Sequence, residues 1–257
     1  MNTANINISS LMIASSLVLI TLFFSYWQKL KLERETFVSV VRAVIQLIAV
    51  GYVLEFIFGL QNPYFTTLLL VFMTFNAAYN AAKRGKEIRK GISISFAAIG
   101  IGTAVTLSIL IFSKTIHYEA AQIIPVGGMI ISNSMVALGL CYKQLSADFK
   151  NKREEVETKL SLGADILPSS MEIIRDSIKT GMLPTIDSAK TLGIVSLPGM
   201  MTGLILAGTP PMEAIRYQIM VTFMLLSTTS ISSFLACYLS YRSFFNSRKQ
   251  LMSNNMI

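Results

Sequence analysis

The residues of this sequence that could do chemistry are a few polar side chains within long apolar stretches. Glu55 is a carboxylate in such a stretch, where charge is costly and is usually functional or paired. It could attract a cation that crosses a membrane, or it could pair with another helix. Three amides, Asn76, Asn80 and Asn133, occur in similar surroundings. Amides inside apolar helices bond neighbouring helices or contact a transported substrate, and the pattern leaves both roles open.

Sulfur-bearing side chains gather near breaks in the apolar stretches. Thioether sulfur is a soft ligand that suits reduced metals. Methionine is also a common filler of irregular apolar space, so each of these residues has two interpretations. The sequence therefore allows a metal path without identifying a metal site. The methionines concerned are Met129, Met135, Met200 and Met201.

The breaks themselves are made by proline and glycine. Pro125 interrupts one apolar stretch, and Pro198–Gly199 interrupts another near its middle. Proline removes a backbone hydrogen bond, and a freed carbonyl is tolerated at membrane depth only if it is buried in protein or faces a cavity. Two broken helices indicate a transport pathway between them. They could equally be packing kinks that let helices approach closely.

Motifs for enzymatic catalysis are missing from the sequence. Gly85-Lys86 lacks the upstream glycine of a phosphate-binding loop. His117 is the only histidine, so neither a His-Glu-x-x-His metal motif nor a buried Ser-His pair can form. We therefore expect a chain that is not an enzyme, that binds no cofactor of its own and that cannot hydrolyse ATP alone.

The composition is that of a membrane protein. The chain has 257 residues, of which 53% are hydrophobic and 14% charged, against about 25% charged in soluble domains. Its N-terminal residues lack a basic region and a small-residue cleavage site, so the first apolar run is expected to be retained. We predict an all-α polytopic membrane protein forming one transmembrane domain over residues 1–257. About seven spans can be drawn, each near the ~20 residues that cross a bilayer: Ile8–Trp27, Thr36–Leu60, Tyr64–Ala82, Ile92–Phe112, Ala120–Leu140, Thr191–Ala207 and Glu213–Tyr241.

The distribution of lysine and arginine predicts the orientation. Segment Lys29–Glu35 holds three, Lys83–Lys90 holds five, Tyr142–Lys190 holds eight and the tail after Tyr241 holds three, whereas the alternate loops hold only Lys114. Cytoplasmic loops carry the positive excess, so the N-terminus is expected outside and the C-terminus inside a cell membrane. The net charge of +8 then reports topology and not nucleic-acid binding.

One long polar loop, at about residues 142–190, is expected in the cytoplasm. Tyr142–Leu162 reads as a helix that extends the fifth span, and Gly163 can stop it. A short amphipathic helix follows, with Ser169 as its N-cap and with Gly181 and Pro184 at its end. This helix either docks a partner or rests on lipid headgroups.

Here the residues resemble a known motif. Glu157, Gly163 and Ile173 have the spacing of the Glu-Ala-Ala loop of ABC-transporter permeases, although Thr158 and Lys159 replace its two alanines. In those proteins the loop forms a coupling helix that sits in a cleft of the ATPase subunit. The resemblance implies that the residues coupled to an ATPase are Glu157, Lys159, Gly163, Ala164, Asp165 and Ile173.

A wider likeness covers nearly the whole chain. Val195–Gly203, which reads VSLPGMMTG, closely resembles the sixth span of the iron-export ABC transporter permease family, and Ile123–Pro125 with Asn133–Met135 resembles its fifth. The resemblance implies a homodimer in the lipid bilayer, a separate ATPase subunit that binds ATP and Mg, and export of metal ions, with iron first. Leu204 stands where a glutamine is expected and Ser132 where a glycine is expected, so the substrate could differ.

Two other functions stay open at this point. An ion-gradient-driven secondary transporter would use Glu55 or Asn133 directly, and a non-transporting scaffold or sensor would use neither. Plant relatives of the family, linked to aluminium tolerance, show that the family does not fix one substrate. The substrate pathway predicted from the residues comprises Glu55, Asn76, Asn80, Pro125, Met129, Asn133, Met135, Pro198, Gly199, Met200 and Met201.

Overall fold

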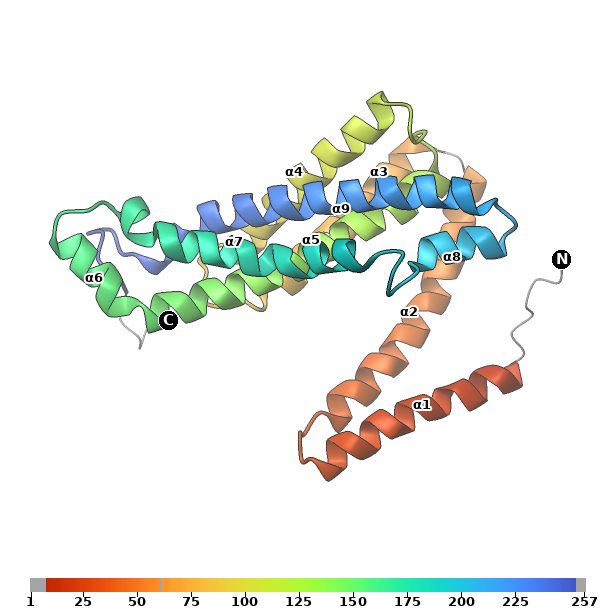
Figure 1. Ribbon diagram of the computed structural model, residues 1–257, viewed down its shortest axis with the longest axis horizontal. Helices are drawn as coiled ribbons and strands as arrows, with labels where there is room; N and C mark the ends of the chain where they lie inside the picture. Colours follow the sequence, from red (N-terminus) through yellow and green to blue (C-terminus); the bar gives the residue numbers. More distant parts are fainter. Residues whose placement is uncertain (1–7, 61, 253–257) are drawn as a thin grey trace. The chain divides into compact units, whose positions relative to one another are not determined.

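The structure, a computed structural model, describes residues 8–60 and 62–252 and confirms the predicted all-α class (Figure 1). In the described residues, extended backbone pairing is limited to two isolated bridges, Leu192–Ser196 and Phe245–Leu251. The helices are α1 (Ile8–Trp27), α2 (Glu33–Leu60), α3 (Pro63–Ala82), α4 (Gly91–Phe112), α5 (Ala120–Asn151), α6 (Arg153–Ser161), α7 (Ile166–Thr191), α8 (Gly199–Leu206) and α9 (Pro211–Ser240), followed by the 3-10 helix η1 (Tyr241–Phe244).

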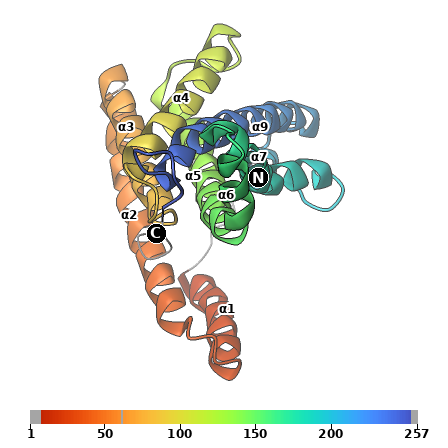
Figure 2. The same ribbon diagram turned by 90° about the vertical axis from the view of Figure 1, so that its left-hand side faces the viewer.

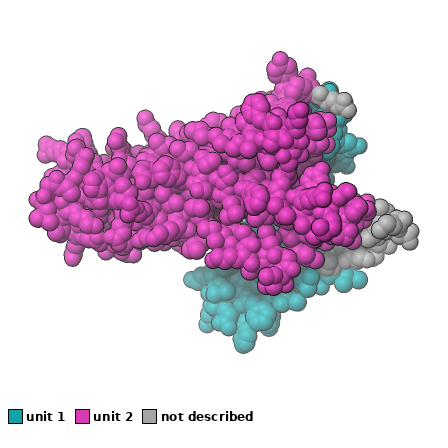
Figure 3. Space-filling view, turned by 45° about the horizontal axis from the view of Figure 1, so that its top comes forward, with its two compact units in different colours: residues 1–61 teal, residues 62–257 magenta. Residues whose placement is uncertain are grey.

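The chain divides into two compact units, Met1–Gln61 and Asn62–Ile257, which Figure 3 colours separately. The first unit is a hairpin of α1 and α2. Ser25 in α1 closes the turn, because its hydroxyl donates to Glu33 Oε1 at 2.9 Å and accepts from the backbone N–H of Leu32 at 3.3 Å. Lys29 and Lys31 take positive φ angles of 53° and 58° in that turn.

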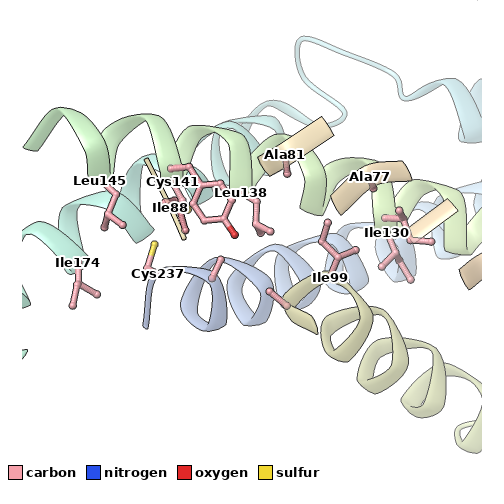
Figure 4. Close-up of a cluster of buried hydrophobic side chains, with 14 of the residues drawn as sticks. Ala77, Ala81, Ile88, Ile99, Ile130, Leu138, Cys141, Leu145, Ile174 and Cys237 are labelled. Atoms are coloured by element: carbon pink, nitrogen blue, oxygen red, sulfur yellow. The ribbon is translucent and has the colours of Figure 1, made fainter. Parts of the chain in front are cut away.

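The second unit is a helix bundle around α5. This helix packs against α3, α7 and α9, while α4 packs against α3 and α9. In both ribbon views α5, α7 and α9 run side by side (Figures 1 and 2). Leu138 and Cys141 from α5, Ile174 from α7 and Cys237 from α9 converge in the apolar core, where each is fully buried (Figure 4).

Hydroxyl groups join α4 to α9 across this core. Thr106 Oγ1 and Thr228 Oγ1 are 2.6 Å apart, and the Ser232 hydroxyl donates to the carbonyl oxygen of Ala98 at 3.2 Å. Small residues and hydroxyl hydrogen bonds replace the hydrophobic driving force between helices in lipid, where tails are as apolar as leucine. The packing of the second unit is therefore of the kind found in membrane bundles.

Five helices of the described chain are long and apolar enough to cross a bilayer: Glu33–Leu60, Pro63–Ala82, Gly91–Phe112, Ala120–Asn151 and Pro211–Phe244. The protein is thus a multi-pass membrane protein. The predicted sixth span, Thr191–Ala207, is wrong as a single helix. The chain turns between Leu192 and Pro198, and α8 has only 8 residues, or about 12 Å, which is too short to cross alone.

The short helix predicted after Gly163 is also corrected. Asp165 and not Ser169 is the N-cap, and α7 continues through Gly181 and Pro184 for 26 residues. Gly181 is not a stop signal, because it lies where α7 crosses α5 and α9. A Cβ there would collide with Cys141 Sγ and would lie 2.9 Å from the carbonyl oxygen of Ala137. Packing on two sides outweighs the one hydrogen bond that Pro184 cannot make.

The extension of the fifth span is present but interrupted. Helix α5 ends at Asn151, Lys152 leaves helical geometry, and α6 resumes at Arg153. Gly163 then takes a φ of +91°, as the predicted stop requires, since glycine alone adopts this region without steric cost. Helix α6, the turn after it and the start of α7 thus form one end of the bundle, here called the tip.

Candidate functional site

The tip between α6 and α7 is stabilised by one capping residue and by ion pairs. The Asp165 side chain accepts a hydrogen bond from the backbone N–H of Ile166 at 2.9 Å, which caps α7. Lys152 reaches Glu172 Oε1 at 2.9 Å and Asp176 Oδ2 at 3.4 Å, so it ties the start of α6 to α7. These hydrogen bonds raise the pKa of Lys152, and the hydrogen bond from Lys152 lowers the pKa of Glu172.

The last described residues fold back against the tip as a small hairpin, residues 244–252, here called the C-terminal hairpin. Phe245 and Leu251 form an antiparallel bridge, and the Met252 N–H donates to the Phe244 carbonyl oxygen at 2.9 Å. The Phe244 ring stacks on Phe149 of α5 with 4.3 Å between ring centroids. The hairpin is therefore anchored in the core of the second unit.

Two basic side chains hold the hairpin to the tip. Arg153 Nη1 donates to the Met252 carbonyl oxygen at 2.7 Å, while Arg153 Nη2 lies 2.6 Å from Glu157 Oε1. Lys249 Nζ is 2.9 Å from Asp165 Oδ1. The hydrogen bond from Lys249 lowers the pKa of Asp165. The cap of α7 is thus also an attachment point of the hairpin.

Between the tip and the hairpin lies a groove of about 650 Å³, here called the tip groove. It carries charges of both signs on a solvated surface. Its lining residues are Glu157, Leu160, Ser161, Gly163, Ala164, Asp165, Arg248, Lys249, Gln250 and Leu251.

The structure brings together most of the residues predicted to couple to an ATPase. Glu157, Gly163, Ala164 and Asp165 line the tip groove. Lys159 instead pairs with Glu155 and lies 3.9 Å from Glu172 Oε2. Ile173 is 2% exposed and belongs to the apolar core, so its role is to seat α7 and not to face the groove.

A second hollow, here called the mid-bundle pocket, lies between α5, α7 and α9 where the chain leaves α7. Its volume is about 220 Å³. Asn133 is thirteen residues from the start of α5, or about 20 Å, and Gln218 is seven from the start of α9, or about 10 Å. The pocket therefore lies inside the bundle, beside two of the helices that are long enough to cross a bilayer. Its lining residues are Asn133, Val136, Ala137, Gly181, Pro184, Thr185, Ser188, Ala189, Leu192, Pro198, Gln218, Thr222 and Leu225.

The break between α7 and α8 lies at this pocket. Leu192 and Pro198, the two ends of the turn, both line it. Irregular backbone at membrane depth is tolerated only where it is buried in protein or lines a cavity. The irregular backbone from Leu192 to Pro198 thus lies beside a cavity, and the role of Pro198 in a pathway stays a prediction.

The pocket is uncharged and rich in hydrogen-bond acceptors. Asn133 Nδ2 donates to the Met129 carbonyl oxygen at 2.8 Å, which leaves its side-chain oxygen as an acceptor. The Thr222 hydroxyl donates to the Gln218 carbonyl oxygen at 2.9 Å. Gln218 Oε1 is buried and has no hydrogen-bond partner among the residues that the structure describes. A buried unpaired oxygen costs about 1–3 kcal/mol and calls for an explanation.

Other predicted pathway residues lie elsewhere. Met129, Met135 and Met200 pack against the apolar core, as filler does, and Met201 is partly buried. Pro125 and Gly199 are exposed on their helices. Asn76 and Asn80 lie on an exposed face of α3, and Glu55 is exposed on α2 in the first unit. In the described residues, no group of three or more His, Cys, Asp or Glu side chains could hold a metal ion.

Sequence reasoning missed several lining residues for identifiable reasons. Gln218 is an amide inside an apolar stretch, the same signal that singled out Asn133, and it could have been found. Thr185 and Ser188 were missed because the sequence predicts a helix end at Pro184, whereas α7 continues to Thr191. The C-terminal hairpin has no sequence signal beyond Asn246, whose side-chain oxygen accepts from the N–H groups of Arg248 and Gln250.

Comparison with known proteins identifies relatives along the whole chain. The model of a family described as Uncharacterised protein family (UPF0014) matches residues 8–245. The chain is 52% identical to the Probable iron export permease protein FetB of Escherichia coli, over 98% of this chain and 97% of that protein. It is 38% identical to the UPF0014 membrane protein YjkA of Bacillus subtilis, over 95% and 98%, and 36% identical to Protein ALUMINUM SENSITIVE 3 of Arabidopsis thaliana, over 92% and 87%. No solved structure matches the chain.

Proposed function

The chain belongs to the UPF0014 family, and from this premise we propose that it is the membrane-spanning subunit of an ABC transporter that exports metal ions. Iron is the first candidate substrate, because the Escherichia coli relative is named a probable iron export permease. ATP and Mg bind to a separate ATPase subunit and not to this chain. Two copies of the chain assemble with two ATPase subunits, as the resemblance to ABC permeases implies.

One observation carries the proposal: helix α7 links the tip groove to the mid-bundle pocket. It begins at Ile166, directly after the groove residue Asp165, and ends at Thr191, beside the pocket residue Leu192. Its 26 residues span about 39 Å without a break. A push on the tip would therefore move one wall of the pocket. Such a rigid element shared by two sites is the physical requirement for coupling.

Gly181 gives this lever its pivot. The helix lies close to both α5 and α9 there, with the Ser233 hydroxyl 3.2 Å and the Ala137 carbonyl oxygen 2.9 Å from the position of a Cβ. Because residue 181 has no side chain of its own, α7 can tilt about this contact without displacing one. ATP-driven closure of the ATPase pair would tilt α7 and switch which side of the pocket is open.

The arrangement of basic segments supports a cytoplasmic tip. Within the second unit, loop Lys83–Lys90 lies at the same end as the tip, since the Ser243 hydroxyl donates to the Arg89 carbonyl oxygen at 3.5 Å. The tip and the C-terminal hairpin carry further lysines and arginines at this end. Lys114 follows the opposite end of α4. The positive end would face the cytoplasm, where an ATPase could reach the groove.

Flux measurements test the proposal. Inside-out vesicles that contain the full chain and a co-expressed ABC ATPase are expected to take up iron only when MgATP is present. Glu157→Ala is expected to lower iron uptake while the pair still binds ATP. Uptake driven by an ion gradient without any ATPase would favour a secondary transporter. Unchanged cellular iron in a deletion strain would favour a scaffold or sensor.

A further inference from the structure

We propose that the mid-bundle pocket binds a divalent cation as its hydrate, through oxygen acceptors on Gln218, Asn133 and Thr222. This inference rests on the proposed transport function and deepens it. It concerns the form in which the ion is held, which the family likeness and the names of relatives leave undefined.

The first step concerns charge and ligand type. No lining residue of the pocket is an acid, a histidine or a cysteine. Transition metals are bound directly by imidazole, thiolate or carboxylate groups, and amides and hydroxyls alone are poor replacements. Direct ligation of a bare iron ion by this pocket is therefore unfavourable.

The second step concerns the direction of the hydrogen bonds. The Asn133 amide donates a hydrogen bond to the Met129 carbonyl oxygen, and the Thr222 hydroxyl donates one to the Gln218 carbonyl oxygen. Both side chains are left with accepting oxygens. Gln218 Oε1 is a buried acceptor without a partner in the described chain. Water molecules around a cation are strong hydrogen-bond donors, so a hydrate supplies what these oxygens lack.

The third step concerns size. Six waters occupy about 180 Å³ at about 30 Å³ each. The pocket volume is about 220 Å³, which is enough for a hydrated ion. Its place beside an interrupted helix also fits, since transporters bind their substrates where helices are broken. Size, acceptor direction and the lack of direct ligands point to the same occupant.

Binding to the purified full chain, with no ATPase present, tests the inference. Mn²⁺ serves as the probe, detected by the loss of the spectrum of free Mn²⁺ in electron paramagnetic resonance. Cobalt(III) hexaammine, which does not exchange its ligands and imitates a hydrated ion, is expected to compete. The dissociation constants of Mn²⁺, Fe²⁺, Co²⁺ and Ni²⁺ are expected to agree within about tenfold, because direct ligation would instead spread them along the Irving–Williams order.

Variants locate the site. Gln218→Leu and Thr222→Val are each expected to weaken Mn²⁺ binding about 3- to 10-fold, the value of one hydrogen bond. The matched control is Thr229→Val. Thr229 also donates its hydroxyl to the carbonyl four residues before it, at 2.7 Å, but it does not line the pocket. Gln218→Leu should not reduce stability, since it removes an unpaired buried oxygen.

Three results would overturn the inference. The first is affinity that rises steeply from Mn²⁺ to Ni²⁺ without competition by cobalt hexaammine, which means direct ligation. The second is unchanged Mn²⁺ binding in Gln218→Leu and Thr222→Val, which places the ion elsewhere. The third is binding of an uncharged solute with no binding of cations. Loss of MgATP-driven uptake with hydrate binding intact would count against the ABC proposal alone.

Discussion

At the scale of single residues, Gly181 shows how the addition of one methyl group can affect the whole bundle. Its hydrogen side chain lets α7 lie directly against Cys141 and Ala137 of α5 and Ser233 of α9. The backbone there is helical, so conformational freedom is not the reason for glycine. The reason is space at a three-helix crossing, and the same space defines the pivot proposed above.

Gly181→Ala is expected to lower the thermal unfolding midpoint of the purified protein, because overpacking of this kind costs about 1–3 kcal/mol. The control is Gly203→Ala in α8, where no atom lies within 4 Å of an added Cβ. That variant should be neutral or slightly stabilising, since alanine favours helix over glycine. The unfolding midpoints are measured by light scattering and intrinsic fluorescence. Equal midpoints for the two variants would contradict tight packing of α5 and α9 at Gly181.

Residue 163 is glycine because of its backbone conformation and not because of limited space. Its φ is +91°, and nothing lies within 4 Å of an added Cβ. Gly163→Val is expected to loosen the tip at a cost of about 1–2 kcal/mol, whereas Gly163→Asn should cost less because asparagine tolerates this region. Amide hydrogen exchange of residues 157–170 measures the difference. A valine variant with the exchange rates of the asparagine variant would show that backbone strain is not the cause.

At the scale of elements, the C-terminal hairpin is the part that sequence patterns did not reveal. It is attached by Arg153 and Lys249 and by the stacking of Phe149 on Phe244. These contacts join residues 84 to 99 positions apart, so no local period records them. The hairpin forms one wall of the tip groove, and any partner that enters the groove meets it.

Arg153→Ala is expected to free the end of the hairpin, because the arginine donates to the carbonyl oxygens of Leu251 and Met252. A spin label at Gln250→Cys should become more mobile, and trypsin should cut faster at Arg248. Lys190→Ala serves as the control, since Lys190 pairs with the nearby Asp187 at 3.0 Å and lies at the other end of α7. If the spin label became more mobile in both variants, its mobility would not report the contacts of Arg153 with the hairpin.

Acid is expected to weaken the attachment through Asp165. Lys249 lowers the pKa of Asp165 in the folded state, so the pair is fully formed above the ordinary aspartate pKa of about 3.9 and is lost as pH falls through the lowered value. Label mobility at Gln250→Cys should therefore stay constant from pH 8 to about pH 5 and rise only in stronger acid. A rise near pH 6 would point to another group.

At the scale of the whole molecule, the proposed transport depends on how the second unit is oriented in the bilayer. The loop Lys83–Lys90 lies at the end of the tip and the hairpin, and Lys114 lies after the far end of α4. The five long apolar helices of the described chain confirm a multi-pass protein, and the match over residues 8–245 confirms the family expected from the motifs. The single-domain expectation over residues 1–257 stays a prediction beside the two compact units.

Thiol labelling in intact cells tests the orientation. Lys114→Cys is expected to react with an impermeant maleimide from outside, and Lys86→Cys only after the membrane is opened. The native Cys141 and Cys237 are buried and should stay unlabelled in both cases, so they provide an internal control. Labelling of Lys86→Cys in intact cells would invert the topology and remove the ATPase from the tip groove.

The sequence alone determined the all-α membrane class, the places of α1 to α5 and α9, the glycine turn at Gly163 and the membership of the family. These depend on composition, apolar run length and local backbone preference, which short segments carry by themselves. Glu157, Gly163, Ala164 and Asp165 line the tip groove, and Asn133 and Pro198 line the mid-bundle pocket, while their roles in coupling and transport stay predictions.

Only the tertiary structure decided the length of α7, the split of the expected sixth span, the place of Gln218 in the mid-bundle pocket and the partners of Arg153. Local signals at Gly181 and Pro184 favour a helix end, but packing between α5 and α9 overrides them. The mid-bundle pocket exists because an interrupted helix meets two continuous ones inside the bundle. That meeting depends on contacts between distant segments, and distant contacts are what a linear pattern does not contain.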